Sequence, residues 1–339
     1  MMQTAPAIAI SGEQANARSL SPVFVVGSPR SGTTLLYHML LSAGNFAIYR
    51  TESSVLNLLE PRFGDLSVAR NRRRLLHAWV GSKLFTASGL DQGEIAARIM
   101  AECRNGGDFL RIVMSEIARK QGVQRWADTT PEHLLYLRRI KETIPDALVI
   151  HMIRDGRDVA LSSDKLQYIR RLWWDRSPSR MAAGLHWQWM VAKGRKDGRA
   201  LGADYTEVRF EDLVRDPAAA LARIGEFIAQ ELDYDLIRKA GIGSVSEPNT
   251  SFAGEANFDP IERWKSGYSK EELAMFEALV GKTLTENGYA LVVTENHLAH
   301  RASVNLMRTS YTSYFRSKLF LKTKTPLGRW LVTRDLSWI

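Results

Sequence analysis

Residues 23–39 read Val-Phe-Val-Val-Gly-Ser-Pro-Arg-Ser-Gly-Thr-Thr-Leu-Leu-Tyr-His-Met. The apolar residues at the start predict a buried strand, and the pattern after Gly32 predicts the beginning of an amphipathic helix. The loop between them carries Gly27 and Gly32. Backbone N–H groups of such a loop, at the positive end of a helix dipole, form a binding site for an anion. The stretch therefore predicts a strand–loop–helix unit that holds phosphate.

The spacing of the two glycines is that of the nucleotide-binding P-loop, but one position departs from that motif. Where a P-loop has lysine, this chain has Thr33, and Thr34 follows. In proteins that hydrolyse ATP or GTP, that lysine reaches the β- and γ-phosphates. We therefore expect a phosphate ligand without ordinary ATP or GTP hydrolysis. For this loop taken alone, the alternative is a Gly-rich turn that binds nothing.

A second motif lies further along the chain. Residues 148–153, Leu-Val-Ile-His-Met-Ile, predict a buried parallel strand. Arg154 follows this strand, and Ser162 lies eight residues later in a predicted helix. A guanidinium binds phosphate through paired, charge-assisted hydrogen bonds, and a hydroxyl adds a further donor. The alternative for Arg154 is a surface salt bridge with Asp155 or Asp158.

The two motifs together resemble those of the sulfotransferases that use 3′-phosphoadenosine-5′-phosphosulfate (PAPS). Residues 30–34, Arg-Ser-Gly-Thr-Thr, are similar to the family's loop for the 5′-phosphosulfate. Arg154 and Ser162 match, in type and spacing, the pair that holds the 3′-phosphate. The resemblance covers about residues 21–291. It implies that the donor is bound by Arg30, Ser31, Gly32, Thr33, Thr34, Arg154 and Ser162.

A later segment resembles the loop that closes over the nucleotide in this family. It comprises residues 249–252, Asn-Thr-Ser-Phe, followed by Arg263, Trp264 and Lys265. The resemblance implies that the last three residues also contact the donor. This chain has Glu-Arg-Trp-Lys-Ser-Gly at residues 262–267, where cytosolic animal enzymes carry a longer Arg-Lys-Gly form.

Sulfuryl transfer needs a group that takes the proton of the acceptor, and Glu52 is our first candidate. It follows the helix after the loop, where the resemblance to tyrosyl-protein and bacterial sulfotransferases implies a catalytic glutamate. The alternative is structural: Glu52 caps a helix at residues 55–59 or pairs with Arg50, since carboxylates are favoured at helix starts.

His133 is the rival base, because a neutral imidazole suits general-base catalysis near neutral pH. It ends Asp-Thr-Thr-Pro-Glu-His, residues 128–133, which resembles the family's Glu-Lys-Thr-Pro-x-His with Thr129 in place of lysine. Arg30 is then the main positive group for the charge that develops on the leaving 5′-phosphate. The alternative for Arg30 is a loop arginine bonded to carbonyls.

Strands and helices alternate along the chain, which predicts an α/β fold with a central parallel sheet flanked by helices. A mostly helical insertion at residues 67–121 is expected to carry acceptor specificity, since variable loops converge at the carboxyl ends of strands. The predicted domains are a flexible leader (1–20), a sulfotransferase domain (21–295) and a basic, aromatic-rich appendage (296–339). The predicted elements are strands at 23–26, 124–128, 148–153 and 205–210, and helices at 32–43, 131–143 and 180–199.

Composition predicts a globular cytoplasmic enzyme. The chain has 339 residues, of which 45% are hydrophobic and 24% charged. The one cysteine, Cys103, excludes an intramolecular disulfide and a cysteine-cluster metal site. The sequence shows neither an apolar stretch of the roughly 20 residues that cross a bilayer nor a secretory signal. His297 and His300 are not joined by further ligand candidates, so we expect no metal.

Residues 297–339 hold much of the net charge of +9, with eight lysines and arginines against one acid, Asp335. Aromatic residues lie between these cations. The pattern fits contact with the inner face of an anionic membrane or with another acidic partner. It fits equally a helix that packs on its own domain or on a second subunit of a homo-oligomer.

The function that these motifs predict is transfer of the sulfuryl group of PAPS to a hydroxyl or amine by in-line displacement. The acceptor stays open between a sugar, a lipid, a peptide and a small molecule. The enzymatic alternative is a P-loop kinase-like phosphotransferase. The non-enzymatic alternative is a membrane- or nucleic-acid-binding protein whose loop is vestigial; the sequence does not indicate a specific nucleic-acid partner.

Overall fold

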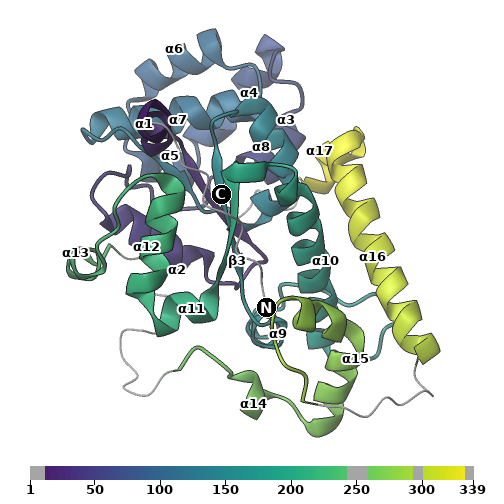
Figure 1. Cartoon of the computed structure of the whole chain (residues 1–339). Coiled ribbons are helices and arrows are strands. Elements are labelled where there is room, and N and C mark those ends of the chain that lie inside the picture. The colour runs from purple at the N-terminus through teal and green to yellow at the C-terminus, as the bar shows by residue number, and fades with distance from the viewer. Residues whose placement is uncertain (1–11, 243–258, 293–300, 333–339) are drawn as a thin grey trace.

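A computed structural model describes residues 12–242, 259–292 and 301–332. It confirms the predicted fold: a parallel sheet with strand order β2-β1-β3-β4 lies between helices (Figure 1). No helix among these residues combines the length and the apolar character that a membrane crossing requires. The strands are β1 (Val23–Gly27), β2 (Ala127–Asp128), β3 (Leu148–Ile153) and β4 (Tyr205–Arg209).

Both faces of the sheet are buried, as expected for parallel strands. Along β1, Val23 and Val25 point to one core cluster, while Phe24 and Val26 point to the other. This alternation is the two-residue period of a strand. Helices α2 (Thr33–Ser42) and α12 (Pro217–Ile228) cover the first face. The second is covered by α7 (Gly106–Lys120), α10 (Ser179–Arg199) and α15 (Lys270–Glu286).

The sheet order places the two phosphate motifs side by side. β1 pairs with β3 along its whole length, up to the pair Gly27 and Met152. A Cβ atom on Gly27 would lie 2.7 Å from the carbonyl oxygen of Met152, so only glycine permits this approach. Each strand then leads into a helix, β1 into α2 and β3 into α9 (Gly156–Lys165). The first turns of both helices therefore lie at the carboxyl edge of the sheet.

The insertion is helical, as predicted, and side chains cap its helices. Asp91 and Asn105 accept hydrogen bonds from the first turns of α6 (Gln92–Glu102) and α7. The remaining described helices follow. They are η1 (Val55–Leu59), α3 (Glu60–Phe63), α4 (Ala69–Val80), α5 (Lys83–Ser88), η3 (Gly202–Asp204), α11 (Phe210–Arg215), α13 (Tyr234–Ala240), α14 (Trp264–Gly267), α16 (Arg301–Lys324) and α17 (Leu327–Leu331).

Two local predictions need correction. The helix expected at 131–143 is a 3₁₀ helix, η2 (Pro131–Tyr136), followed by α8 (Leu137–Thr143), and the N–H of His133 bonds to the carbonyl of Thr130 three residues back. Part of the expected flexible leader is helix α1 (Gly12–Leu20). Arg18 anchors α1, because its guanidinium donates to the carbonyls of Phe227 and Ala203.

Helix α16 packs along α10 and α15 (Figure 1). Met307, Tyr311 and Phe315 belong to the core cluster on the second face of the sheet. The Tyr311 hydroxyl donates to Asp175 (2.6 Å) and accepts the N–H of Leu172 (3.0 Å). Apolar burial and hydrogen bonding therefore hold α16 against the α/β domain.

We expect Tyr311→Phe to lower the free energy of unfolding by about 1–3 kcal/mol, because it leaves the buried Asp175 carboxylate and Leu172 N–H without their partner. Tyr314→Phe is the matched control, since Tyr314 is exposed on the same helix, and it should stay within about 0.5 kcal/mol of wild type. Urea unfolding measures both. Equal stability of Tyr311→Phe and wild type would contradict the packing role of this hydroxyl.

Candidate active site

The loop after β1 has an unusual backbone that exposes the start of α2. Gly32, the N-cap residue, has φ 89°, and Arg30 has φ 75°. A Cβ atom on Gly32 would lie 2.2 Å from the ring of Phe210. No side chain caps the first turn of α2. The N–H groups of that turn thus stay available to bind an anion.

Buried polar atoms surround this turn. Ser31 is fully buried, and its Oγ has no hydrogen-bond partner among the described residues; the same holds for Nε of the buried Arg154. Buried polar atoms are bonded in the great majority of cases. A hydroxyl and a guanidinium N–H of this kind fit a phosphate group, which accepts several hydrogen bonds.

The predicted pair Arg154 and Ser162 meets the loop directly. Arg154 donates to the carbonyls of Arg30 (3.1 Å) and Pro260 (2.6 Å), and its guanidinium lies 4.5 Å from the centre of the Phe210 ring. The Nε of Arg30 donates to the Ser162 hydroxyl (2.8 Å). The structure therefore joins the two motifs, although more than 120 residues separate them in sequence.

Three arginines lie within electrostatic range of one another at this point. Desolvation lowers the pKa of Arg154, and the like charges of Arg30 and Arg263 lower it further, against the opposing carboxylates Asp158 and Glu211. Desolvation also lowers the pKa of Arg30. Positive charges that are buried and mutually repelling stabilise a bound anion. Arg263, which the sequence assigns to the segment closing over the nucleotide, thus belongs to the same group of arginines as Arg30 and Arg154.

The neighbours of Arg263 are placed differently. Trp264 is buried, and its ring lies 3.7 Å from the guanidinium of Arg157. Lys265 is exposed and pairs with Glu262. Both line a cavity of about 350 Å³. Residues 249–252, the other part of this prediction, lie outside the described residues, as do His297 and His300.

Asp158 holds this segment against α9, a role that sequence reasoning missed. Its two carboxylate oxygens accept the backbone N–H groups of Glu262 (3.0 Å) and Trp264 (2.8 Å). Desolvation raises the pKa of Asp158 to about 6. From the sequence, Asp158 is a candidate only for a salt bridge with Arg154. Its position in the first turn of a helix could not reveal a partner 106 residues away.

Glu52 lies in a strained turn beside two further carboxylates. Ser54 has φ 50°, and the π-helix η1 follows it. Single turns of π-helix are frequent at functional sites. The Glu52 side chain keeps access to solvent. Desolvation by the surrounding protein, with smaller contributions from Glu132 and Asp128, raises the pKa of the Glu52 carboxyl to about 7. A carboxylate with such a pKa can accept a proton near neutral pH.

His133 is fully buried, and both of its ring nitrogens have partners. Nδ1 lies 2.8 Å from the Asp128 carboxylate, and Nε2 accepts the N–H of Leu56 at 3.2 Å. These two contacts assign the neutral tautomer with the proton on Nδ1. His133 thereby ties β2 to η1, the element that follows Glu52.

Glu132 connects the Glu52 region with the arginines. Its carboxylate accepts hydrogen bonds from Asn57 (2.6 Å) and from the hydroxyl of Tyr168 (3.0 Å). Desolvation opposes ionisation of Glu132, but Lys322 of α16 and these hydrogen bonds hold its pKa below the usual range. Tyr168 also interacts electrostatically with Arg30. Sequence reasoning missed Tyr168 and Lys322, because only tertiary packing brings them here.

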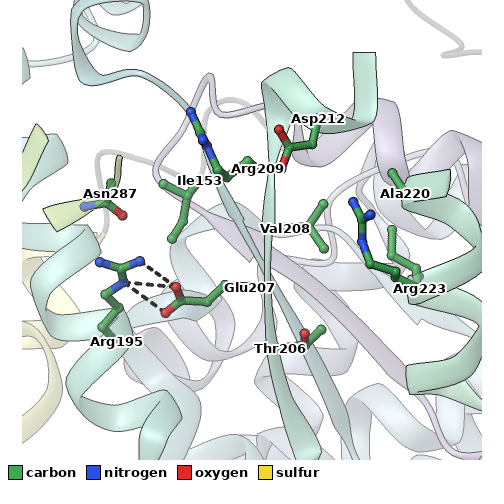
Figure 2. Close-up of a pocket in the computed structure, with 11 residues that line it drawn as sticks. Ile153, Arg195, Thr206, Glu207, Val208, Arg209, Asp212, Ala220, Arg223 and Asn287 are labelled. Atoms are coloured by element: carbon green, nitrogen blue, oxygen red, sulfur yellow. Dashed lines mark hydrogen bonds and ion pairs between the residues drawn. The ribbon is translucent and has the colours of Figure 1, made fainter. Parts of the chain in front are cut away.

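A separate cavity of about 340 Å³ lies beside β4, at the edge of the sheet. Figure 2 shows its lining. Arg195 pairs with Glu207, and Arg209 and Arg223 lie to the two sides of β4 in this view. None of the predicted site residues lines it. Within residues 12–242, 259–292 and 301–332, no three histidine, cysteine or acidic side chains converge as metal ligands would.

The comparison with protein families decides the identity. The model of the sulfotransferase family matches residues 22–234, well over half of the chain. The chain belongs to the sulfotransferase family. The match contains the loop at residues 30–34, the pair Arg154 and Ser162, and both candidate bases, Glu52 and His133. Among curated proteins, no sequence matches this sulfotransferase.

Solved structures show the same fold. The sulfotransferase domain of the Synechococcus PCC 7002 olefin synthase is 20% identical, with a TM-score of 0.51 over 78% of this chain and 94% of its own. The sulfotransferase domain from the curacin biosynthetic pathway is 16% identical, with a TM-score of 0.53 over 80% of this chain and 98% of its own. At these identities the likeness of this sulfotransferase to both domains is one of fold.

Proposed function

We propose that this sulfotransferase transfers the sulfuryl group of PAPS to a hydroxyl or amine of its acceptor. The observation that carries the proposal is the pairing of two anion sites at the ends of β1 and β3. One is the uncapped first turn of α2, and the other is the Arg154–Ser162 pair beside Arg30. PAPS carries two anionic groups, a 5′-phosphosulfate and a 3′-phosphate, which would occupy one site each.

The residues divide between these two groups. The N–H groups of the turn, with the hydroxyls of Ser31, Thr33 and Thr34, would hold the 5′-phosphosulfate. The buried Arg154 and the Ser162 hydroxyl would hold the 3′-phosphate. Arg263, with its neighbours Trp264 and Lys265, would complete the nucleotide side. PAPS supplies a sulfuryl group already activated by its bond to phosphate. Arg30 would stabilise the charge that develops on the leaving phosphate.

We assign the general base to Glu52. Its carboxyl keeps solvent access and has a pKa of about 7, so it is ionised in a useful fraction near neutral pH. Tyr168 interacts with both Arg30 and Glu132, and Glu132 acts on Glu52, which supports a base close to the proposed donor site. His133 remains the rival, but the N–H of Leu56 already occupies its Nε2 lone pair.

Donor binding is tested by titration calorimetry with 3′-phosphoadenosine 5′-phosphate (PAP), without metal. We expect Arg154→Ala to weaken binding by about 2–3 kcal/mol, because it removes charge-assisted hydrogen bonds, and Ser162→Ala by about 1 kcal/mol. Arg111→Ala is the control, since Arg111 is a half-exposed arginine that pairs with Asp146 outside the site. If Arg154→Ala binds PAP as tightly as wild type, the donor assignment is wrong.

The base is tested by Glu52→Gln, which should lower turnover by a factor of about 10²–10⁴. Turnover is followed by mass spectrometry, as products that gain one SO₃ group when a cell extract receives PAPS. In wild type, kcat/KM should rise with pH through about 7, because the base acts only when it is ionised. Glu94→Gln, an exposed glutamate of α6, is the control and should keep full turnover.

Stability separates Glu52 from His133. The raised pKa means that the folded state binds the Glu52 proton more tightly, so the contribution of Glu52 to stability falls as pH rises from about 4.5 to 7. Glu52→Gln should therefore be at least as stable as wild type at pH 8. His133→Ala should lose roughly 2–4 kcal/mol, since it leaves a cavity and unpaired partners. Full turnover in Glu52→Gln, with turnover lost in a folded His133→Ala, would reverse the two roles.

A further inference from the structure

Exposed apolar side chains gather in two segments. Thirteen large apolar residues are exposed in the described part of the chain, and eight of them lie within residues 166–173 and 306–330. Trp173 is 89% exposed and Trp330 66% exposed, while Leu306 and Phe320 are each near 60%. Tryptophan is highly buried on average in soluble proteins. Exposure on this scale marks an interaction surface.

The same two segments are basic. Residues 165–176 carry four cations and one acid, Asp175, and that acid is buried and bonded to Tyr311. Residues 301–332 contain seven lysines and arginines and no acid. The two segments therefore present positive charge that no exposed acid of their own offsets.

The two segments adjoin at two points and border the Glu52 region. Tyr311 of α16 bonds to Leu172 and Asp175 of the first segment. Further along, Tyr168 of the first segment and Lys322 of α16 both act on Glu132. We call the exposed side chains of residues 165–176, α16 and α17 the basic aromatic surface. At Tyr168 it adjoins Glu132, which acts electrostatically on the proposed base.

We propose that the basic aromatic surface binds an anionic lipid bilayer and that the acceptor hydroxyl belongs to a lipid headgroup. Exposed tryptophan, leucine and phenylalanine among lysines and arginines match a membrane interface, where apolar groups enter the headgroup region and cations meet anionic lipids. A second copy of this chain fits less well, because a twofold contact would set cations against cations.

The acceptor class rests on the proposed function. The donor's bond between sulfur and the phosphate oxygen breaks, and a bond forms between sulfur and the headgroup oxygen. The hydroxyl proton goes to the Glu52 carboxylate, and the products are PAP and a lipid sulfate ester. A bilayer on the basic aromatic surface would bring headgroups close to the Glu52 region, since the exposed Tyr168 belongs to this surface and donates to Glu132, which acts electrostatically on Glu52.

Membrane binding is tested by sedimentation of the full chain with vesicles of phosphatidylcholine, with and without an equal part of phosphatidylglycerol. Wild type should bind only the anionic vesicles, and less as salt rises. The double variant Trp173→Ser/Arg170→Gln should bind at least tenfold more weakly. The matched control Leu236→Ser/Lys239→Gln also removes one exposed apolar residue and one cation, but from α13, across the molecule from α16 (Figure 1). It should bind as wild type does.

Two results would overturn the membrane assignment. One is wild-type protein that ignores anionic vesicles, and the other is equal vesicle binding by both double variants. A change of oligomeric state in the Trp173 variant, with unchanged vesicle binding, would assign the surface to a second copy instead. Affinity for PAP should be the same in both variants, which separates this test from the donor site.

The acceptor class is tested with ³⁵S-labelled PAPS and two extracts, one of total lipids as vesicles and one of water-soluble metabolites. Label should enter the organic phase, and at least tenfold less with the Trp173→Ser/Arg170→Gln variant. Label confined to water-soluble products would overturn the lipid acceptor and leave the sulfotransferase proposal intact. Absence of transfer to either extract, together with absence of PAP binding, would instead contradict the proposed function.

Discussion

The buried guanidinium of Arg154 ties together the three segments that form the proposed donor site. It bonds to the carbonyl of Arg30 in the loop after β1 and to that of Pro260, and it stacks on Phe210 at the start of α11. The backbone carbonyl of Arg154 accepts the indole N–H of the buried Trp187. Arg30 and Arg263 lie within electrostatic range of Arg154 and carry charges of the same sign. The free protein therefore holds repelling cations together, and an anion at this point relieves the repulsion.

The sheet makes this convergence possible. Because β1 and β3 are neighbours, the two helices that follow them begin at one edge, and the close approach at Gly27 keeps the strands in register. Asp158 in the first turn of α9 then receives the backbone of residues 262–264. The proposed 3′-phosphate side is thus assembled from one strand end and a distant segment. The region of Glu52 is held by the contacts of His133 with Asp128 and with the N–H of Leu56.

Local sequence patterns predicted the strand, loop and helix elements on which the proposed donor site is built. The strand at 148–153 has the predicted bounds, and the loop geometry follows from glycine spacing and helix start. The surroundings of Glu52 could be predicted from the sequence only in part. Tyr168, Lys322 and Asn57 reach Glu132 through packing between segments that are far apart in sequence. The 3₁₀ helix at Pro131 and the helix α1 were missed for a similar reason. Tertiary hydrogen bonds from His133 and Arg18 override local propensity there.

We propose above all that two neighbouring anion sites hold one nucleotide. A crystal structure of the complex with PAP tests it most directly. The account predicts the 3′-phosphate on Arg154 and Ser162, with Arg154 turned from the carbonyls of Arg30 and Pro260, and the 5′-phosphate on the first turn of α2. PAP bound elsewhere, such as in the cavity beside β4, or in this place with its 3′-phosphate away from Arg154, would contradict the account.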